Sequence, residues 1–272
     1  MSDVTTHDGL YGPDDVTWRV NREMVLLAGG GRALLLQVAH PLVAAGVAEH
    51  SSYREELWGR LYRTLDVTTQ IVFGDAEASR QAARRLRATH GRVQGVADDG
   101  TRYEARDPEL LLWVWATLVE TSLRIYGRYV RPLSVVEVER YYAEQQRFGQ
   151  ATGIPPDRFP DTHADFVDYF DRMVAGELRV TNAARDVAES VLRPRVPLPL
   201  RPAAWPASGW LNLVTVGLLP PAVRERYGLE WGPRRAALLE ASTAAIRRLL
   251  PLLPSLMREF PPARSAARRR TS

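Results

Sequence analysis

The sequence contains neither cysteine nor lysine. Without cysteine the chain forms no disulfide bond, offers no thiolate to a metal and has no cysteine nucleophile. All 36 basic residues are arginines, and they are interspersed with the 32 acidic residues along the whole chain. Arginine is a planar, permanently charged group that suits carboxylates and phosphates. Because the arginines do not cluster on one element, the pattern argues against a nucleic-acid-binding surface.

The chain also lacks a long hydrophobic run. Its most apolar stretch, residues 33–48, is interrupted by Gln37, His40 and Pro41. This stretch is shorter than the roughly 20 residues that a membrane-spanning helix needs. The first residues are polar and acidic, which is not the composition of a signal peptide. We therefore expect a cytoplasmic protein with no transmembrane segment.

The composition is that of a globular protein with a hydrophobic core, with 45% hydrophobic and 25% charged residues among 272. Apolar residues recur at helical spacing nearly everywhere, and no segment shows the alternation typical of a strand. Residues 96–108 are the one region where a hairpin is expected, because Asp99-Gly100 is a turn dipeptide. The sequence predicts an all-α fold, a single helical bundle of roughly ten helices with a C-terminal helical annex.

Several polar residues indicate where helices begin and end. Residues 16–29 are predicted as a first helix, ended by the three glycines at 29–31. Pro41 suits the first turn of another helix, because its missing N–H is not needed there. Asp75 is expected to cap a helix that carries His90 near its end. Further caps are expected at Asp107, Ser134 and Thr162.

Composition also divides the chain into segments. Dense proline at 193–206 favours an extended polyproline strap. Three consecutive arginines near the C-terminus make only a weak case for a contact with anionic lipid. We expect a flexible N-terminus (1–13), a helical core (14–192), the proline-rich strap (193–206), C-terminal helices packed on the core (207–262) and a disordered basic tail (263–272).

Three of the five histidines have ordinary structural interpretations. His7 belongs to the flexible start. His50 is expected at a helix C-terminus, where a cation meets the negative end of the helix dipole. His163 is expected to be a solvent-exposed residue at a helix cap.

His40 and His90 differ, because both are expected on apolar faces. His90 falls on the stripe of Ala82, Ala83, Leu86 and Val93. A buried imidazole costs free energy unless it has hydrogen-bond partners. Each of the two is therefore either a satisfied core histidine or a functional group, and the spacing alone leaves both interpretations open.

Common catalytic motifs are missing. The chain has no Glu-x-x-His pairs of a di-iron bundle, no His-Glu-x-x-His zinc motif and no Gly-x-Ser-x-Gly. A site with one histidine ligand in an arginine-rich bundle remains, and it suits haem. Haem needs one neutral imidazole at the iron and cations for its propionates. Gly91 and Gly95 would permit the close approach of a flat ring.

Several ordered segments resemble the MpaB-type oxygenases, a family that includes the catalytic domain of latex-clearing rubber oxygenases. The segments begin at residues 29, 60, 89, 107 and 131 and read GGGRALLLQVAHPLVAAGVAEHSSY, RLYRTLDVTTQIVFGD, THGRVQG, DPELLLWVWATLVE and RPLS. The resemblance runs from about Val16 to about Pro262. It implies an all-helical fold with a b-type haem whose iron is bound by one histidine, and the matching position is His90.

The resemblance also assigns roles on the opposite, distal side of the haem. Rubber oxygenases have an Arg-x-x-Lys-Thr motif there, and this chain has Arg60, Arg63 and Thr64, with arginine in the place of the lysine. Helical spacing puts these three residues within about one turn. They would face the iron or the propionates. His40 matches the family's Ala-His-Pro segment and is the candidate distal acid or base.

One further departure is Trp115, where many members have histidine. The aromatic residues of that helix are expected in the core: Trp113, Trp115, Tyr126 and Tyr129. The resemblance implies a haem-dependent oxygenase that uses dioxygen and an apolar small molecule or lipid-like substrate. Two alternatives stay open at this point. One is a haem-binding protein without turnover, and the other is a helical interaction protein without a cofactor.

Overall fold

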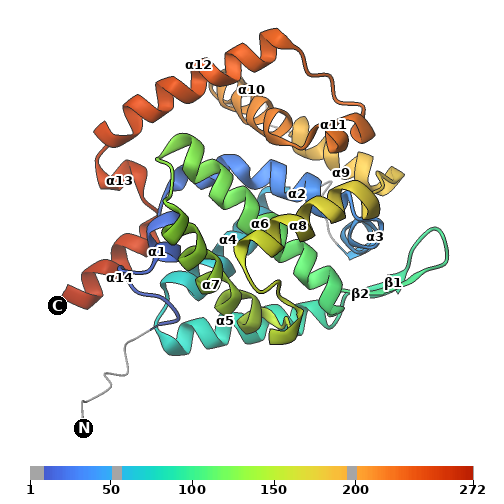
Figure 1. Cartoon of the computed structure of the whole chain (residues 1–272), viewed down its shortest axis with the longest axis horizontal. Helices are drawn as coiled ribbons and strands as arrows, with labels where there is room; N and C mark the ends of the chain where they lie inside the picture. The colour runs from blue at the N-terminus through green and yellow to red at the C-terminus, as the bar shows by residue number, and fades with distance from the viewer. Residues whose placement is uncertain (1–8, 51–56, 195–200, 272) are drawn as a thin grey trace.

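Helices form almost throughout the chain, as the computed structural model shows (Figure 1). The structure describes residues 9–50, 57–194 and 201–271, with the side chains of 57–63, 201–206 and 270–271 left out. Within these residues there are fourteen α-helices and one hairpin, so the all-α class is confirmed. The expected number of about ten helices is too low, because the chain adds short helices between the long ones.

The helices and strands follow one another in this order: α1 (Val16–Asn21), α2 (Gly30–Val38), α3 (Pro41–His50), α4 (Leu57–Phe73), α5 (Ala76–His90), β1 (Gln94–Val96), β2 (Arg102–Glu104), α6 (Pro108–Tyr129), α7 (Val135–Thr152), α8 (His163–Arg172), α9 (Asn182–Leu192), α10 (Arg201–Leu218), α11 (Pro221–Tyr227), α12 (Pro233–Leu249), α13 (Ser255–Arg258) and α14 (Pro261–Thr271). Strands β1 and β2 pair antiparallel as the predicted hairpin, with Gly95 opposite Tyr103. Shorter helical turns include Met24–Gly29 before α2 and Leu250–Leu252 after α12.

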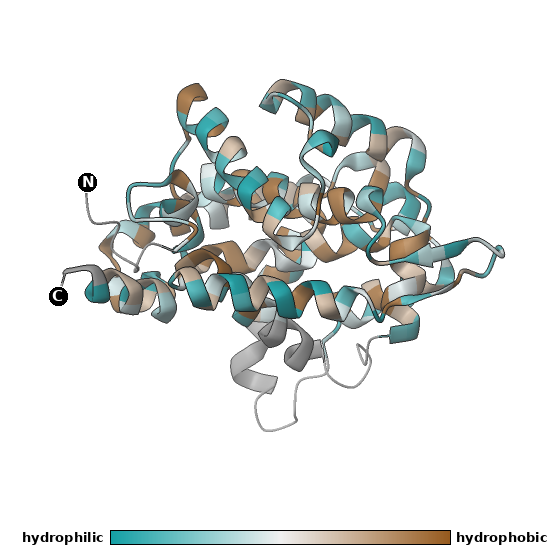
Figure 2. Ribbon diagram, turned by 90° about the horizontal axis from the view of Figure 1, so that it is seen from below, coloured by the Kyte–Doolittle hydropathy of each residue, from teal (hydrophilic) through white to brown (hydrophobic). Residues whose placement is uncertain are grey.

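Helix α6 lies at the centre of the fold, and α1, α2, α7 and α12 pack around it (Figure 1). Hydrophobic segments concentrate in this interior, whereas the outer helices carry many hydrophilic residues (Figure 2). The four aromatic residues expected in the core are buried along α6: Trp113, Trp115, Tyr126 and Tyr129. Trp113 also donates a hydrogen bond from Nε1 to the carbonyl of Leu36 in α2 (3.2 Å).

Arg32 of α2 is a fully buried cation in the middle of this packing. Its Nε donates to the carbonyl of Leu218 at the end of α10 (2.6 Å). Its Nη1 donates to Glu120 and to Thr121 Oγ1 of α6. Burial lowers the pKa of Arg32, and the charge of Glu120 opposes this shift. One side chain therefore joins α2, α6 and α10.

Local capping chemistry sets the helix starts where it was expected. Asp75 accepts a hydrogen bond from the Ala78 N–H at the start of α5, and Asp107 accepts one from the Glu109 N–H at the start of α6. Ser134 and Thr162 form capping boxes with the acidic residues three positions later. These four predictions are confirmed.

The predicted first helix, residues 16–29, is wrong in its extent. It breaks after α1, and the three glycines do not end it, because Gly30 and Gly31 begin α2. The break is at Glu23, whose buried carboxylate accepts two hydrogen bonds from Arg258 (2.7 and 2.8 Å). Gly31 allows close packing instead, since a Cβ there would lie 2.4 Å from Thr215 Oγ1 of α10.

The expected terminal segments also need correction. Residues 263–272 were expected to be disordered, but α14 extends to Thr271 and buries Ala263 and Ala266 near α4. Residues 201–206 of the expected proline-rich strap lie in α10, while 195–200 fall outside the described residues. At the other end, Tyr11 is buried and donates a hydrogen bond to the Glu144 carbonyl (2.7 Å), so residues 9–13 are not flexible.

None of the helices in the described ranges is by itself long and apolar enough to cross a membrane. One pair of segments, Met24–Val38 and Pro41–His50, passes that test together by length and composition, with a bend of 109° between them.

The Arg32 network predicts a large effect of one substitution. An Arg32→Met variant should lose about 3 kcal/mol of unfolding free energy, because Glu120 stays partly buried after losing its internal partner. Urea unfolding followed by circular dichroism measures this loss. The control is Arg124→Met, which removes a half-exposed arginine from the same carboxylate and should cost less than about 1 kcal/mol. Equal losses in the two variants would contradict the central role of Arg32.

Candidate functional site

His40 lies at the corner between α2 and α3. The carbonyl of Ala39 accepts a hydrogen bond from the Arg179 N–H (2.8 Å), which fastens this corner to the segment before α9. The imidazole is half-buried, and its Nδ1 is buried with no hydrogen-bond partner among the described residues. Burial lowers the pKa of His40, and the nearby carboxylates of Glu177 and Asp107 partly offset that. His40 is therefore not a satisfied core histidine.

His90 is the last residue of α5 and has the same character. The residue is half-buried. Within the described ranges its Nδ1 is buried and has no hydrogen-bond partner, whereas Nε2 is not among the buried atoms that lack a partner. Burial lowers the pKa of His90, and the positive charge of Arg106 lowers it further. The ring is thus kept neutral at physiological pH, with Nε2 available as a donor or ligand atom.

Two consecutive residues connect the surroundings of these histidines. Arg106 acts on the pKa of His90, and Asp107 acts on the pKa of His40. Both residues stand at the start of α6, directly after the hairpin. Since electrostatic influence of this kind falls off with distance, both imidazoles lie near the N-terminal end of the central helix. Charges of two consecutive residues, Arg106 and Asp107, therefore act on two histidines that are 50 positions apart in the sequence.

The segment with Arg60, Arg63 and Thr64 lies on α4, which packs against α5. The two helices are joined by a short turn at Gly74, so they run in opposite directions. Arg60 precedes that turn by about as many residues as His90 follows it. Since each residue of an α-helix rises 1.5 Å, Arg60 in α4 and His90 in α5 lie at about the same distance from the turn, beside each other along the two helices. The side chains of Arg60 and Arg63 lie outside the described part of the chain, and Thr64 is exposed.

The other histidines are placed largely as expected. His50 ends α3, and its Nε2 lies 3.1 Å from the Gln94 carbonyl of the hairpin. His163 follows the capping residue Thr162 at the start of α8, but it is half-buried rather than exposed. Its ring packs near Tyr142 and Phe166, which explains the difference. His7 falls outside the described residues.

The two glycines after His90 have a different role from the expected one. A Cβ at Gly91 would lie 2.3 Å from the guanidinium of Arg106, and one at Gly95 would lie 2.6 Å from the Tyr103 hydroxyl. Arg106 and Tyr103 therefore fill the space that was assigned to a flat ring. Gly91 matters to the site in another way, because it lets the Arg106 side chain approach the end of α5.

Trp115 is part of the core. Its Nε1 donates a hydrogen bond to the Gln145 carbonyl (3.0 Å), and its ring contacts Phe159 and Phe166 edge-on. The side chain is buried, so this position serves packing between α6, α7 and α8.

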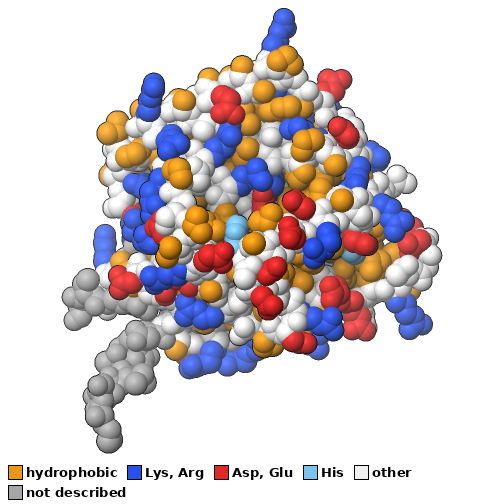
Figure 3. Space-filling model, viewed as in Figure 1, with side chains coloured by type: hydrophobic (Ala, Val, Ile, Leu, Met, Phe, Trp, Pro, Cys, Tyr) orange, Lys and Arg blue, Asp and Glu red, His pale blue; other side chains and the backbone are white. Residues whose placement is uncertain are grey.

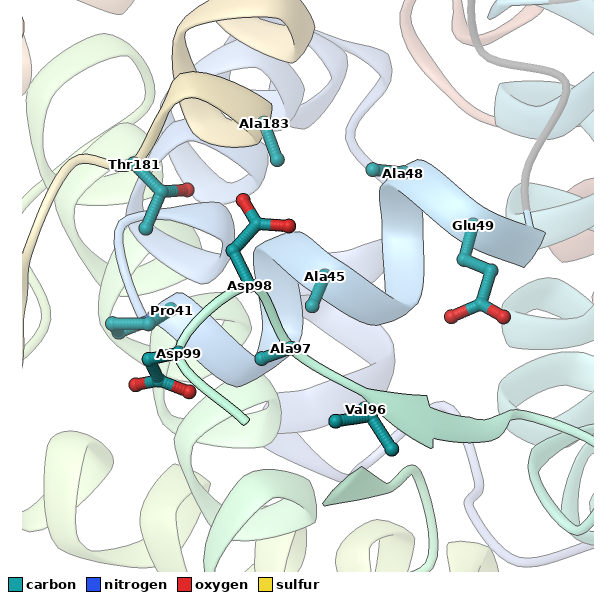
Figure 4. A pocket seen from close by; sticks show the side chains of 10 residues that line it. All are labelled: Pro41, Ala45, Ala48, Glu49, Val96, Ala97, Asp98, Asp99, Thr181 and Ala183. Atoms are coloured by element: carbon teal, nitrogen blue, oxygen red, sulfur yellow. The ribbon is translucent and has the colours of Figure 1, made fainter. Parts of the chain in front are cut away.

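A pocket of about 370 Å³ lies beside α3 on the side of the hairpin (Figure 4). Its walls come from α3, from the turn of the hairpin and from the start of α9, and they are lined with small side chains and with carboxylates, namely Glu49, Asp98 and Asp99. None of the predicted site residues lines it, although Pro41 directly follows His40. The described residues also contain no group of three or more histidine or acidic side chains that could hold a metal ion.

Comparison with known proteins places the chain among oxygenases. Residues 18–248 match the family described as ER-bound oxygenase mpaB/B'/Rubber oxygenase, catalytic domain. The chain belongs to this family. Two uncharacterized proteins, from Mycobacterium bovis and Mycobacterium tuberculosis, are each 26% identical over 229 residues, which cover 81% of this chain and 87% of theirs. No solved structure matches the chain.

The matched range of this oxygenase domain includes all five predicted site residues. Arg106 and Asp107 were missed as neighbours of the histidines. Asp107 was recognised only as a helix cap, and nothing in the sequence pattern placed Arg106 against Gly91. Their positions depend on the hairpin, which returns the chain from the end of α5 to the start of α6.

The lowered pKa values predict how stability depends on pH. Unfolded histidines bind protons at pH values below about 6.5, whereas buried His40 and His90 resist protonation. The unfolding free energy should therefore fall as the pH falls below about 6.5. A His90→Gln variant should lose part of this dependence, because the residue that resists protonation is removed. Urea unfolding between pH 5 and 7.5 tests this. The exposed control is Arg84→Gln. If the unfolding free energy of His90→Gln falls with pH as steeply as that of the control, His90 does not resist protonation and the assignment is contradicted.

The electrostatic effect of Arg106 can be measured separately. An Arg106→Gln variant should raise the pKa of His90, because a nearby positive charge is removed. Nuclear magnetic resonance titration of the imidazole carbon-bound protons reports this pKa directly. Arg80→Gln is the control, since position 80 is about 15 Å further along α5. A pKa that stays constant or falls in Arg106→Gln would show that Arg106 does not act on His90.

Proposed function

We propose that this oxygenase domain binds haem b through His90 and uses dioxygen to oxidise an apolar small molecule or a lipid-like substrate. The observation that carries the proposal is the imidazole of His90, which is held neutral and unpartnered at the end of α5. A buried ring nitrogen without a hydrogen bond is costly, and proteins keep such groups where they have a function.

Two properties of His90 itself suit a haem iron, its neutral imidazole and its Nε2 atom. Iron in a b-type haem needs one neutral imidazole. His90 would provide it, because its lowered pKa keeps the ring uncharged. Its Nε2 would be the ligand atom, because Nδ1 is the buried nitrogen. The ligating histidines of metal sites usually donate their other N–H to an acceptor. Here the neighbouring charged group is Arg106, which can only donate hydrogen bonds. The His90 ring is therefore suited to bind a metal by its lack of charge, and not by a hydrogen-bond acceptor at Nδ1.

Haem would supply the redox chemistry with dioxygen, and the protein would supply binding and orientation. Arg60 and Arg63 would hold the propionates, since guanidinium groups bind carboxylates through paired hydrogen bonds. Thr64 would donate a hydrogen bond on the distal side. These assignments rest on the family's Arg-x-x-Lys-Thr motif and on the level of α4 beside the end of α5.

His40 would act as the distal acid or base. Its lowered pKa keeps it neutral near pH 7, so it is ready to accept a proton. Its Nδ1 is buried, which leaves Nε2 as the atom that exchanges the proton. Glu177 and Asp107 would stabilise the imidazolium once it forms, because both carboxylates act on this ring. The position at the α2–α3 corner is firm, owing to the hydrogen bond between Arg179 and Ala39.

The absorption spectrum of purified protein supplemented with haem tests the proposal. The wild type should show a Soret band at one haem per chain, and His90→Ala should lose most of the bound haem. His50→Ala is the control, because that exposed histidine has a carbonyl partner and its removal should leave the spectrum unchanged. A wild type without a Soret band would end the proposal, and stoichiometric haem in His90→Ala would end the ligand assignment.

Turnover is tested on the loaded protein. Reduced protein exposed to oxygen should yield an oxidised product from apolar candidate substrates, and His40→Ala should slow turnover at least 100-fold while it retains haem. Haem that binds normally but gives no product with any substrate would favour a binding protein over an oxygenase.

A further inference from the structure

The C-terminal part of the chain exposes an unusual amount of apolar surface. Six of the ten large hydrophobic residues that are exposed in the described part of the chain lie between positions 238 and 257. They are Leu238, Leu249, Leu252, Leu253, Leu256 and Met257, with exposed fractions from 37% to 77%. Contiguous apolar exposure of this kind marks a binding surface on a folded protein. We call the exposed side chains of residues 238–257 the leucine patch.

Helix α12 shows how the patch is built, because it has two apolar stripes. One stripe faces inward, where Leu239 and Ile246 pack with α10 and α6. The other consists of residues at helical spacing that are all exposed, namely Leu238, Ala241, Ala245 and Leu249. The outward stripe extends about 16 Å along the helix. It continues into residues 251–257, every one of which is exposed.

Positive charge surrounds this patch. Residues 233–258 contain five arginines and one glutamate, and Arg258 among them is paired with the buried Glu23. Arg247 and Arg248 have no acidic partner among the described residues, and they directly precede Leu249. The one acidic residue, Glu240, is paired with Arg128 (2.6 Å). The free charge beside the patch is therefore positive.

The patch lies at the edge of the molecule, which lets a flat surface reach it. Figure 1 shows α12 on the outer side of α10, with α13 beyond its end. In the same view, Figure 3 shows hydrophobic and basic side chains next to each other at this edge. Pro251 and Pro254 restrict the backbone here, so the exposed leucines are presented by a stiff segment.

We propose that the leucine patch binds the surface of a bilayer that contains anionic lipid. Leucine and methionine side chains would enter the boundary between headgroups and acyl chains, and Arg247 and Arg248 would contact the headgroup phosphates. A protein partner is less favoured, because the patch offers cations in excess and no free carboxylate. This inference rests on the exposed surface alone and does not depend on haem or on turnover.

Sedimentation of the full chain with lipid vesicles tests this proposal. Vesicles of phosphatidylcholine with 30% phosphatidylglycerol should bind the protein, and binding should weaken at high salt. A Leu252→Gln/Leu256→Gln variant should bind the vesicles at least tenfold more weakly, because two apolar side chains that would enter the bilayer are replaced by polar ones. Val135→Gln/Val136→Gln is its control, because these two valines are equally exposed outside the patch, and it should bind like the wild type.

The arginines have a matched control too. Arg247→Gln/Arg248→Gln should reduce binding to the anionic vesicles about 25-fold, at roughly fivefold per arginine. Arg80→Gln/Arg84→Gln changes the net charge equally on the exposed side of α5 and should have little effect.

Three results would overturn the proposal. The wild type would fail to bind anionic vesicles, the patch variants would bind as well as their controls, or sedimentation would show a dimer of the free protein that the leucine substitutions dissociate. The last result would assign the patch to a second copy of the chain.

Discussion

The burial of one guanidinium group constrains the arrangement of the central helices. Arg32 loses its hydration completely, so its partners must be in place for the fold to be stable. Those partners belong to α6 and to the end of α10, and α2 can therefore pack in only one register. Further along α2, Trp113 and Tyr227 donate to the carbonyls of Leu36 and Leu35. The corner with His40 follows directly from this fixed helix.

Helix α6 connects that constraint to the candidate site. Its middle pairs with Arg32, and its start carries the two charged residues that act on His40 and His90. A displacement of α6 would therefore disturb the core and both histidines together. The leucine patch differs, because it lies on the outer side of α12 and contributes nothing to this network. The apolar surface at the edge of the oxygenase domain is thus separate from the Arg32 network and from the two histidines.

The sequence allowed the features that depend on local chemistry to be predicted. The caps at Asp75 and Ser134 need partners only three residues away, and they were found at the expected positions. The features that were missed depend on distant partners. Glu23 breaks a helix because Arg258 binds it across 235 positions, and α14 is ordered because Ala263 and Ala266 pack against the fold. In the site, helical spacing placed His90 on an apolar face, but only folding places Arg106 beside it.

The central claim is that His90 provides the single protein ligand of a haem iron. A crystal structure of the chain reconstituted with haem b tests it most directly. The account predicts a bond between His90 Nε2 and the iron, with the start of α4 on the opposite face of the ring and His40 not bound to the metal. Iron bound by His40, or a haem seated away from the end of α5, would contradict the account.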